Sequence, residues 1–201
     1  VSSDVISTGV PGLNDMFDGG GFYRGSNILV SGTAGTAKTT VGCYFANEQC
    51  KNNEKTIYFA FEESPQQLIR NMKSIGIDLE KHIKKGLLQI HSSRPSLNGL
   101  EMHLLTLRKL IKEFKPTTII IDPISNLITV GSEQEVRSML VRLIDMLKAN
   151  NITALLTSLN KQTDAVRPDL AEESVSSLVD TWITVRDMEG IGERNRGIFI
   201  I

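Results

Sequence analysis

The chain has 201 residues, of which 40% are apolar and 22% charged, so it can bury one substantial core, whereas two independent domains would be cramped. Its 22 Lys and Arg residues nearly cancel its 23 Asp and Glu residues, which argues against nucleic acid or an anionic membrane as a partner held by overall charge. No apolar run approaches the roughly 18 residues of a membrane span, and no secretory signal is visible. We therefore expect a cytoplasmic protein without a membrane partner.

The ends of the chain and its two cysteines give further expectations about domain organisation and thiol chemistry. The first residue is Val1 rather than Met, and Ile201 lies within an apolar run, so we expect residues 1–201 to be a single domain from a longer polypeptide. Cys43 and Cys50 are too few and too isolated for a disulfide framework or a zinc site. Both fall in a predicted helix, which indicates buried, reduced thiols.

Short apolar runs alternate with helical patterns along the whole chain. This alternation is typical of an α/β fold in which helices flank a central, mostly parallel sheet. The predicted strands are 28–30, 57–61, 87–90, 118–121, 153–157 and 181–185. Apolar stripes at helical spacing within 100–114 and 136–147 predict two helices that cover the sheet. Residues 160–173 lack such periodicity and predict a surface loop, of the kind that often lies beside a ligand in α/β proteins.

A glycine-containing segment joins the first predicted strand to a helix. Residues 32–39 read GTAGTAKT and match the Walker A pattern in the strand-to-helix context that this motif requires. Glycines let successive backbone N–H groups face a polyphosphate, and the following helix presents its positive end. Lys38 would contact the β- and γ-phosphates of ATP, and the Thr39 hydroxyl would bind Mg²⁺. The predicted nucleotide-binding residues here are Gly32, Thr33, Ala34, Gly35, Thr36, Ala37, Lys38, Thr39 and Thr40.

Ala37 stands immediately before the lysine, where the motif usually has glycine. A Cβ would be costly if this position required a positive φ, but the geometry at the start of a helix tolerates alanine. We therefore expect reduced room near the phosphates and retained binding.

The apolar strand at 118–121 delivers one carboxylate, Asp122, at its carboxyl end, as a Walker B motif does. Asp is also a common turn residue at the end of a strand. The combination with the phosphate loop favours a role for Asp122 in the Mg²⁺ shell.

Two adjacent acids, Glu62 and Glu63, end another strand pattern. Neighbouring side chains of an extended chain point oppositely, so only one can face a ligand directly. That residue would be a general base acting on a water or hydroxyl, and Glu62 is also a candidate metal ligand. Alternatively, both acids begin the next helix, where they suit the helix dipole, with Ser64 as the N-cap and Pro65 as the first residue.

Five segments together resemble the KaiC family of RecA-related ATPases. They are STGVPGLND at 7–15, GGGF at 19–22, the loop ending in Lys38 and Thr39, FEES at 61–64 and IDPIS at 121–125. The resemblance covers nearly the whole chain and is strongest to the family's second, C-terminal ATPase domain. It implies a RecA-like P-loop NTPase fold, ATP with Mg²⁺, and a circadian-clock or signalling role. Asn14 and Ala37 depart from the family pattern, which has Asp at the first position and usually Gly at the second.

The resemblance also implies roles for single residues. Glu62 and Glu63 match the family's catalytic glutamate pair, with Glu62 as the base. A hexameric ring would hold ATP between neighbouring subunits, and Arg196 matches an arginine that reaches a neighbour's nucleotide. The alternative for Arg196 is an ordinary solvated charge in a turn.

Ser176 and Ser177 align with the family's adjacent phosphorylated serine and threonine. They would accept phosphate from a neighbouring subunit's ATP, and a phosphate adds about −1.5 to −2 charge at a subunit boundary. Alternatively, they are ordinary capping or loop hydroxyls.

Three functions therefore remain open for the chain. The first is a KaiC-like ATPase in which Glu62 activates either water or a serine hydroxyl, with clock or signalling proteins as partners. The second is a nucleic-acid motor, against which the neutral charge balance and the lack of a basic, aromatic-rich segment argue. The third is an assembly scaffold that binds ATP to close a ring and hydrolyses it negligibly.

Overall fold

The computed structural model describes residues 3–160, 175, 177–190 and 193–201. A seven-stranded sheet forms its centre, and every neighbouring pair of strands is parallel except the last pair. From edge to edge the strands are β5 (Leu88–Ser92), β4 (Thr56–Ala60), β6 (Thr118–Asp122), β7 (Thr153–Leu159), β3 (Asn27–Gly32), β8 (Thr181–Gly190) and β9 (Glu193–Ile200). The mostly parallel sheet predicted from the sequence is confirmed.

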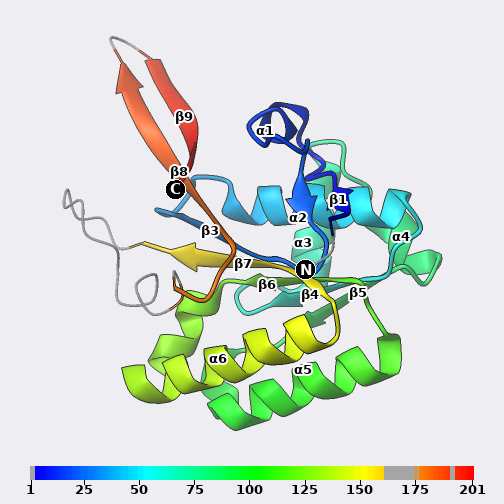
Figure 1. Ribbon diagram of the computed structural model, residues 1–201, viewed down its shortest axis with the longest axis vertical. Helices are drawn as coiled ribbons and strands as arrows, with labels where there is room; N and C mark the ends of the chain where they lie inside the picture. The colour runs from blue at the N-terminus through cyan, green and yellow to red at the C-terminus, as the bar shows by residue number, and fades with distance from the viewer. Residues whose placement is uncertain (1–2, 161–174, 176, 191–192) are drawn as a thin grey trace.

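Helices cover both faces of this sheet (Figure 1). One face carries α2 (Lys38–Lys51), α3 (Pro65–Lys73) and α4 (Glu80–Lys84), and the other carries α5 (Leu100–Phe114) and α6 (Glu133–Ala149). The described part of the chain also contains short elements: β1 (Val5–Ile6), α1 (Pro11–Asn14), β2 (Phe22–Tyr23) and the 3₁₀ turns η1 (Pro95–Leu97) and η2 (Ile124–Thr129).

The core consists of two apolar layers separated by the sheet. Side chains alternate between the faces of a strand, so Ile28 and Val30 pack in the layer with α2, whereas Leu29 between them packs in the layer with α5 and α6. Because both faces are buried, the central strands read as continuous apolar runs. For this reason the central strands do not show the alternation of apolar and polar residues that is typical of a strand with one exposed face.

Strand ends differ from the sequence-based boundaries. The strand predicted at 57–61 ends at Ala60, and the one predicted at 181–185 continues to Gly190. The extension has a physical cause, because β8 pairs with antiparallel β9 beyond the point where β3 ends. The outer part of this hairpin projects from the layered body (Figure 1).

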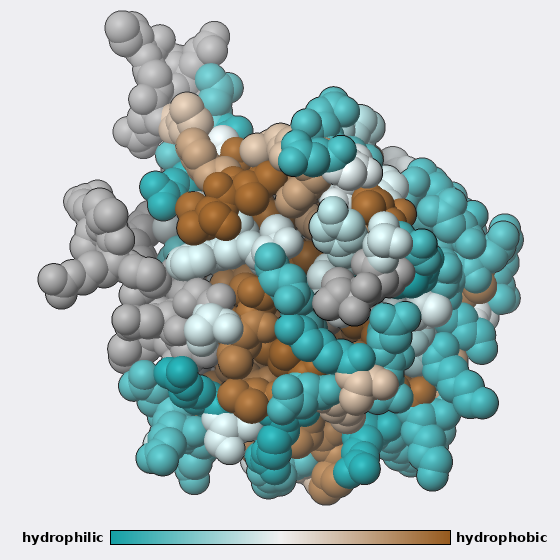
Figure 2. All heavy atoms as spheres, in the orientation of Figure 1, coloured by the Kyte–Doolittle hydropathy of each residue, from teal (hydrophilic) through white to brown (hydrophobic). Residues whose placement is uncertain are grey.

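Hydrophobic side chains gather in the middle of the face shown in Figure 2, between mostly hydrophilic margins, and at the foot of the β8–β9 hairpin. The exposed apolar residues of this hairpin and its end include Met188, Phe199, Ile200 and Ile201. Across the described ranges, no helix has the length and apolar character needed to cross a membrane.

Candidate functional site

The carboxyl ends of the parallel strands meet at one edge of the sheet. Gly32 of β3 is level with Leu159 of β7, and Ala60 of β4 is level with Asp122 of β6. The loop at 32–37, the Glu pair and Asp122 therefore emerge at the same edge. In α/β folds this is where ligands bind, outside the carboxyl ends of the strands.

The loop after β3 is compact and folds back on itself. A Cβ at Gly32 would lie 2.4 Å from the carbonyl oxygen of Val185 on β8, so only glycine fits there. The Thr36 hydroxyl donates to the carbonyl oxygen of Thr33 at 2.9 Å, and the buried Lys38 amine donates to the same oxygen at 2.6 Å. The amine of Lys38 therefore lies against the loop, hydrogen-bonded to its backbone.

Ala37 adopts φ 74° and ψ 25°, a left-handed conformation. The expectation that it has the geometry of an ordinary helix start is wrong: the turn from the loop into α2 demands a positive φ, which costs an L-residue roughly 1–2 kcal/mol. Ala37 is the N-cap of α2 and offers no side-chain cap to the helix amides. The N–H groups of the first turn, which receive no side-chain cap, suit an anion together with the helix dipole.

Asp122 lies at the end of β6 and is only 8% exposed. The Tyr58 hydroxyl donates to its Oδ2 at 2.6 Å, and the Thr157 hydroxyl donates to its Oδ1. A buried carboxylate is costly without such partners. The sequence predicted Asp122 but not the two hydroxyls, which lie within the buried strands β4 and β7.

Glu62 and Glu63 contact different elements. The amide Nδ2 of Asn126, in η2, donates to Glu62 Oε1 at 3.1 Å, whereas Nδ2 of Asn71, in α3, donates to Glu63 Oε2 at 3.1 Å. Glu62 is exposed and Glu63 is half-buried. The two carboxylates therefore have different hydrogen-bond partners, and neither asparagine was singled out from the sequence.

The helix-start pattern after the Glu pair is confirmed at the next two residues. Ser64 is the N-cap of α3, and its hydroxyl accepts from the Gln67 amide while the Gln67 side chain accepts from the Ser64 amide. Pro65 is the first residue of the helix. Both acids thus precede the helix, in the connection from β4.

The remaining predicted residues lie at separate places. Thr39 and Thr40 are half-buried in the first turn of α2. Arg196 is in β9, not in a turn, with its Nε 3.8 Å from Oδ1 of Asp187 and its side chain 58% exposed. Ser177 is exposed in a turn before β8, and Ser176 falls outside the described residues.

The donor set fits Mg²⁺ brought in with a phosphate ligand. Within the parts of the chain that the structure describes, no three His, Cys, Asp or Glu side chains gather into a metal cluster. Mg²⁺ needs no such cluster, because proteins commonly hold it through one or two carboxylates, waters and substrate phosphates. One buried carboxylate, Asp122, and one hydroxyl in the first turn of α2, Thr39, match that requirement.

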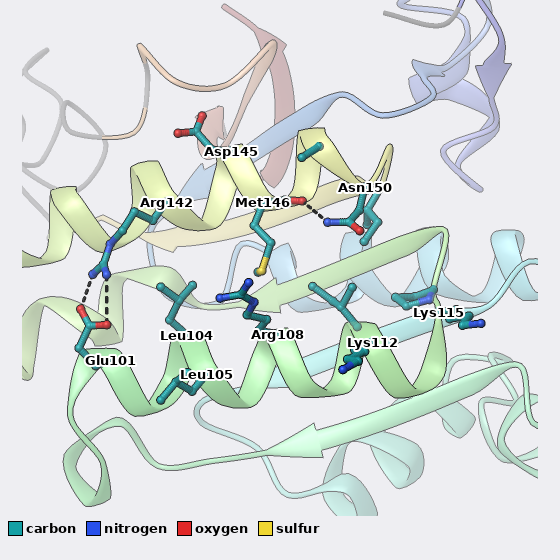
Figure 3. Close-up of a pocket in the computed structure, with 14 residues that line it drawn as sticks. Glu101, Leu104, Leu105, Arg108, Lys112, Lys115, Arg142, Asp145, Met146 and Asn150 are labelled. Atoms are coloured by element: carbon teal, nitrogen blue, oxygen red, sulfur yellow. Dashed lines mark hydrogen bonds and ion pairs between the residues drawn. The ribbon is translucent and has the colours of Figure 1, made fainter.

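A groove of about 960 Å³ lies elsewhere, between α5 and α6 on the opposite face of the sheet (Figure 3). The Glu101 carboxylate and the Arg142 guanidinium join across one end of it through paired hydrogen bonds. The Arg108 side chain reaches from α5 toward Met146 of α6. None of the predicted phosphate-loop or acidic residues lines this groove, so it is separate from the candidate site.

The fold and this site define a class of protein. These features belong to a P-loop nucleotide-binding protein: a mostly parallel sheet, a glycine-containing loop leading from β3 into an uncapped helix, a lysine bonded back to that loop, and a buried aspartate at the end of β6, which β7 separates from β3.

Comparison with known proteins narrows the class. Residues 6–201 match the family described as "ATPase: KaiC", and the chain belongs to this family of RecA-like P-loop proteins. It is 45% identical over 201 residues to the circadian clock protein KaiC2 of a Synechocystis strain, covering 100% of this chain and 35% of that protein. It is 38% identical over 197 residues to the circadian clock oscillator protein KaiC of Acaryochloris marina, covering 98% and 37%. The corresponding protein of Synechococcus elongatus is 37% identical over 198 residues, with 98% and 38% covered. The chain thus spans little more than a third of these relatives.

Proposed function

We propose that the chain binds ATP with Mg²⁺ at residues 32–40 and hydrolyses the nucleotide, with Glu62 as the general base. The observation that carries this proposal is the start of α2: an uncapped helix end, preceded by the glycine-containing loop, with Lys38 as its first residue. Such an end directs its backbone N–H groups and positive potential toward a polyphosphate. Membership of an ATPase family agrees with it.

Each residue has a defined task in this proposal. The Lys38 amine exchanges the carbonyl oxygen of Thr33 for the β- and γ-phosphates, and the loop amides bind the remaining phosphate oxygens. Mg²⁺, when bound, neutralises charge that develops on the transferred phosphoryl group. Thr39 and Asp122 would hold the ion, with Glu62 as a further candidate. The exposed Glu62 carboxylate, held by Asn126, orients and deprotonates the attacking water.

Calorimetry and a turnover assay test these tasks separately. We expect the wild-type chain to bind ATP and ADP, and Lys38→Ala to abolish or greatly weaken that binding. The double variant Glu62→Gln and Glu63→Gln should bind ATP and lose turnover. If well-folded wild-type protein takes up neither nucleotide, the proposal is wrong; if the double variant still hydrolyses ATP at the wild-type rate, only the assignment of the base is wrong.

We further propose that Ser176 and Ser177 accept phosphate from ATP. The exposure of Ser177 in a turn supports access to a donor. Mass spectrometry after incubation with ATP and Mg²⁺ should detect phosphoserine in the peptide that carries this pair, and Ser176→Ala with Ser177→Ala should remove the signal. Absence of phosphate on wild-type protein that turns over ATP would leave hydrolysis as the only reaction.

The site is proposed to work between subunits of a homo-oligomeric, hexameric ring. The apolar side chains exposed on the β8–β9 hairpin and its end support a contact with another chain, as does the exposed guanidinium of Arg196 beside them. The printed names of the relatives suggest a circadian-clock or signalling setting. Sizing with and without ATP and Mg²⁺ should show a larger species with nucleotide, and a monomer under both conditions would contradict the ring for this chain.

A further inference from the structure

Three buried side chains form a hydrogen-bonded row beneath α2. Tyr58 of β4, Asp122 of β6 and Thr157 of β7 are all oriented to the α2 side of the sheet, because each lies an even number of residues from a neighbour packed in the α2 layer. Tyr58 and Thr157 are fully buried, and each donates to a different oxygen of the Asp122 carboxylate. The two hydroxyls therefore fix the rotation of this carboxylate.

Helix α2 packs directly against this row of side chains. A Cβ at Gly42 would lie 3.5 Å from the Tyr58 hydroxyl and 3.1 Å from Cγ2 of Ile120, so α2 rests directly on this part of the sheet. The next residue, Cys43, is fully buried in the same apolar layer as Tyr58. Burial raises the pKa of the Cys43 thiol, so this group stays protonated.

Thr39 and Gly42 are three residues apart in α2, so they lie on the same side of the helix, about one turn from each other. We propose that Tyr58 is a positioning residue for nucleotide-bound Mg²⁺: its hydroxyl orients the Asp122 carboxylate and, through the close packing of α2 at Gly42, sets the spacing between that carboxylate and the helix turn that carries Thr39. This inference rests on the proposed function, since it requires Thr39 and Asp122 to serve one metal ion.

The expected consequence is specific to the metal. Without the Tyr58 hydroxyl, Asp122 Oδ2 has no hydroxyl donor from β4, and the carboxylate can rotate away from the ion. Loss of a partner that orients a metal ligand typically weakens metal affinity about 10- to 100-fold. The loop amides and Lys38 do not involve Tyr58, so the affinity for nucleotide without metal should not change.

The test uses Tyr58→Phe, which keeps the aromatic ring and removes only the hydroxyl. The affinity for a fluorescent ADP analogue is measured in EDTA, and Mg²⁺ is then titrated into the complex. We expect an unchanged affinity in EDTA and a Mg²⁺ half-saturation concentration about 10- to 100-fold higher than in the wild type. Tyr23→Phe, in which an exposed phenol of β2 is altered, should match the wild type, and Asp122→Asn should remove most of the Mg²⁺ effect.

A second variant keeps the proposal testable if Tyr58→Phe fails to fold. Thr157→Val removes the other hydroxyl at nearly constant shape and should shift the Mg²⁺ titration in the same direction, without altering binding in EDTA. If either variant folds and titrates with Mg²⁺ as the wild type does, the positioning role of its hydroxyl is overturned. A purely structural role would lower the melting temperature and leave the Mg²⁺ half-saturation concentration unchanged. If the wild type binds no nucleotide at all, the proposed function itself fails, a result that the variants alone cannot mimic.

Discussion

At the scale of single residues, the phosphate loop contains a side chain in a conformation that favours glycine. Ala37 has φ 74°, whereas Ala34, three residues earlier in the same loop, is not among the positions with positive φ. The strained position sits between the loop and the first residue of α2, where the backbone must turn its amides toward the ligand space. The two alanines therefore offer a matched pair for measuring this strain.

We expect Ala37→Gly to stabilise the nucleotide-free protein by about 0.5–1 kcal/mol, because relief of roughly 1–2 kcal/mol of strain exceeds the added flexibility of the unfolded chain. Ala34→Gly should destabilise it, since only the entropic effect remains. Urea unfolding of both variants beside the wild type measures the difference. Equal destabilisation by the two substitutions would show that the left-handed conformation costs nothing.

His82 makes the folding stability of the protein depend on pH. The side chain is buried, its Nε2 lies 2.9 Å from Oδ1 of Asn47, and its Nδ1 has no hydrogen-bond partner among the described residues. Burial lowers the pKa of His82, and the nearby Lys81 and Lys85 lower it further. The unfolded chain takes up a proton near the usual value of about 6.5, so the stabilising contribution is present above that pH and is lost as pH falls from there toward the lowered pKa of the folded state.

Thermal unfolding between pH 7.5 and 5 should therefore show a falling melting temperature, and His82→Gln should make the fall shallower. Glutamine can still donate to Asn47 and does not titrate. His91 shifts in the same direction through its own burial, so part of the slope should remain in the variant. An unchanged slope in His82→Gln would assign the pH dependence to other groups.

At the scale of elements, the sequence could predict six of the seven strands of the central sheet and the two helices of the α5–α6 layer, because burial leaves a strong apolar pattern. The edge strand β9 was not predicted. The sequence could also place the phosphate loop and Asp122, since both follow strands directly. It could not predict the Tyr58 and Thr157 contacts to Asp122, because these residues come from strands 64 positions before and 35 positions after it in the chain. Nor could it show the conformation of Ala37, which depends on how α2 docks on the sheet.

The two asparagines that hold the acidic pair belong to different elements and allow their roles to be separated. If Glu62 is the base, Asn126→Ala should lower kcat about 2- to 10-fold, which corresponds to one exposed hydrogen bond of roughly 0.5–1.5 kcal/mol. Asn71→Ala, which frees Glu63, should change kcat little. Steady-state ATPase rates and ADP affinities of both variants provide the comparison, and the affinities should stay near wild type. A larger loss in Asn71→Ala would transfer the role of base to Glu63.

At the scale of the whole molecule, the sheet brings the loop, the acids and Asp122 to one edge, while Arg196 lies on the projecting β8–β9 hairpin. Its guanidinium pairs with Asp187 at 3.8 Å and remains 58% exposed. A cation placed on an extension of this kind suits the site of a neighbouring chain. This arrangement makes a prediction that distinguishes action within one chain from action between chains.

Arg196→Ala and Glu62→Gln should each be nearly inactive as pure proteins, and a mixture of the two should recover activity. In a ring that mixes them equally, about a quarter of the interfaces join an intact Glu62 to an intact Arg196, since each partner is correct half of the time. The ATPase rate of the mixture, assembled with nucleotide, should therefore approach about a quarter of the wild-type rate.

A mixture of Arg196→Ala with Lys38→Ala provides a second complementing pair, because Lys38 acts in the same chain as Glu62. If neither mixture exceeds the sum of its separate components although both variants assemble, Arg196 does not act on a neighbour's nucleotide, and the site is complete within one chain.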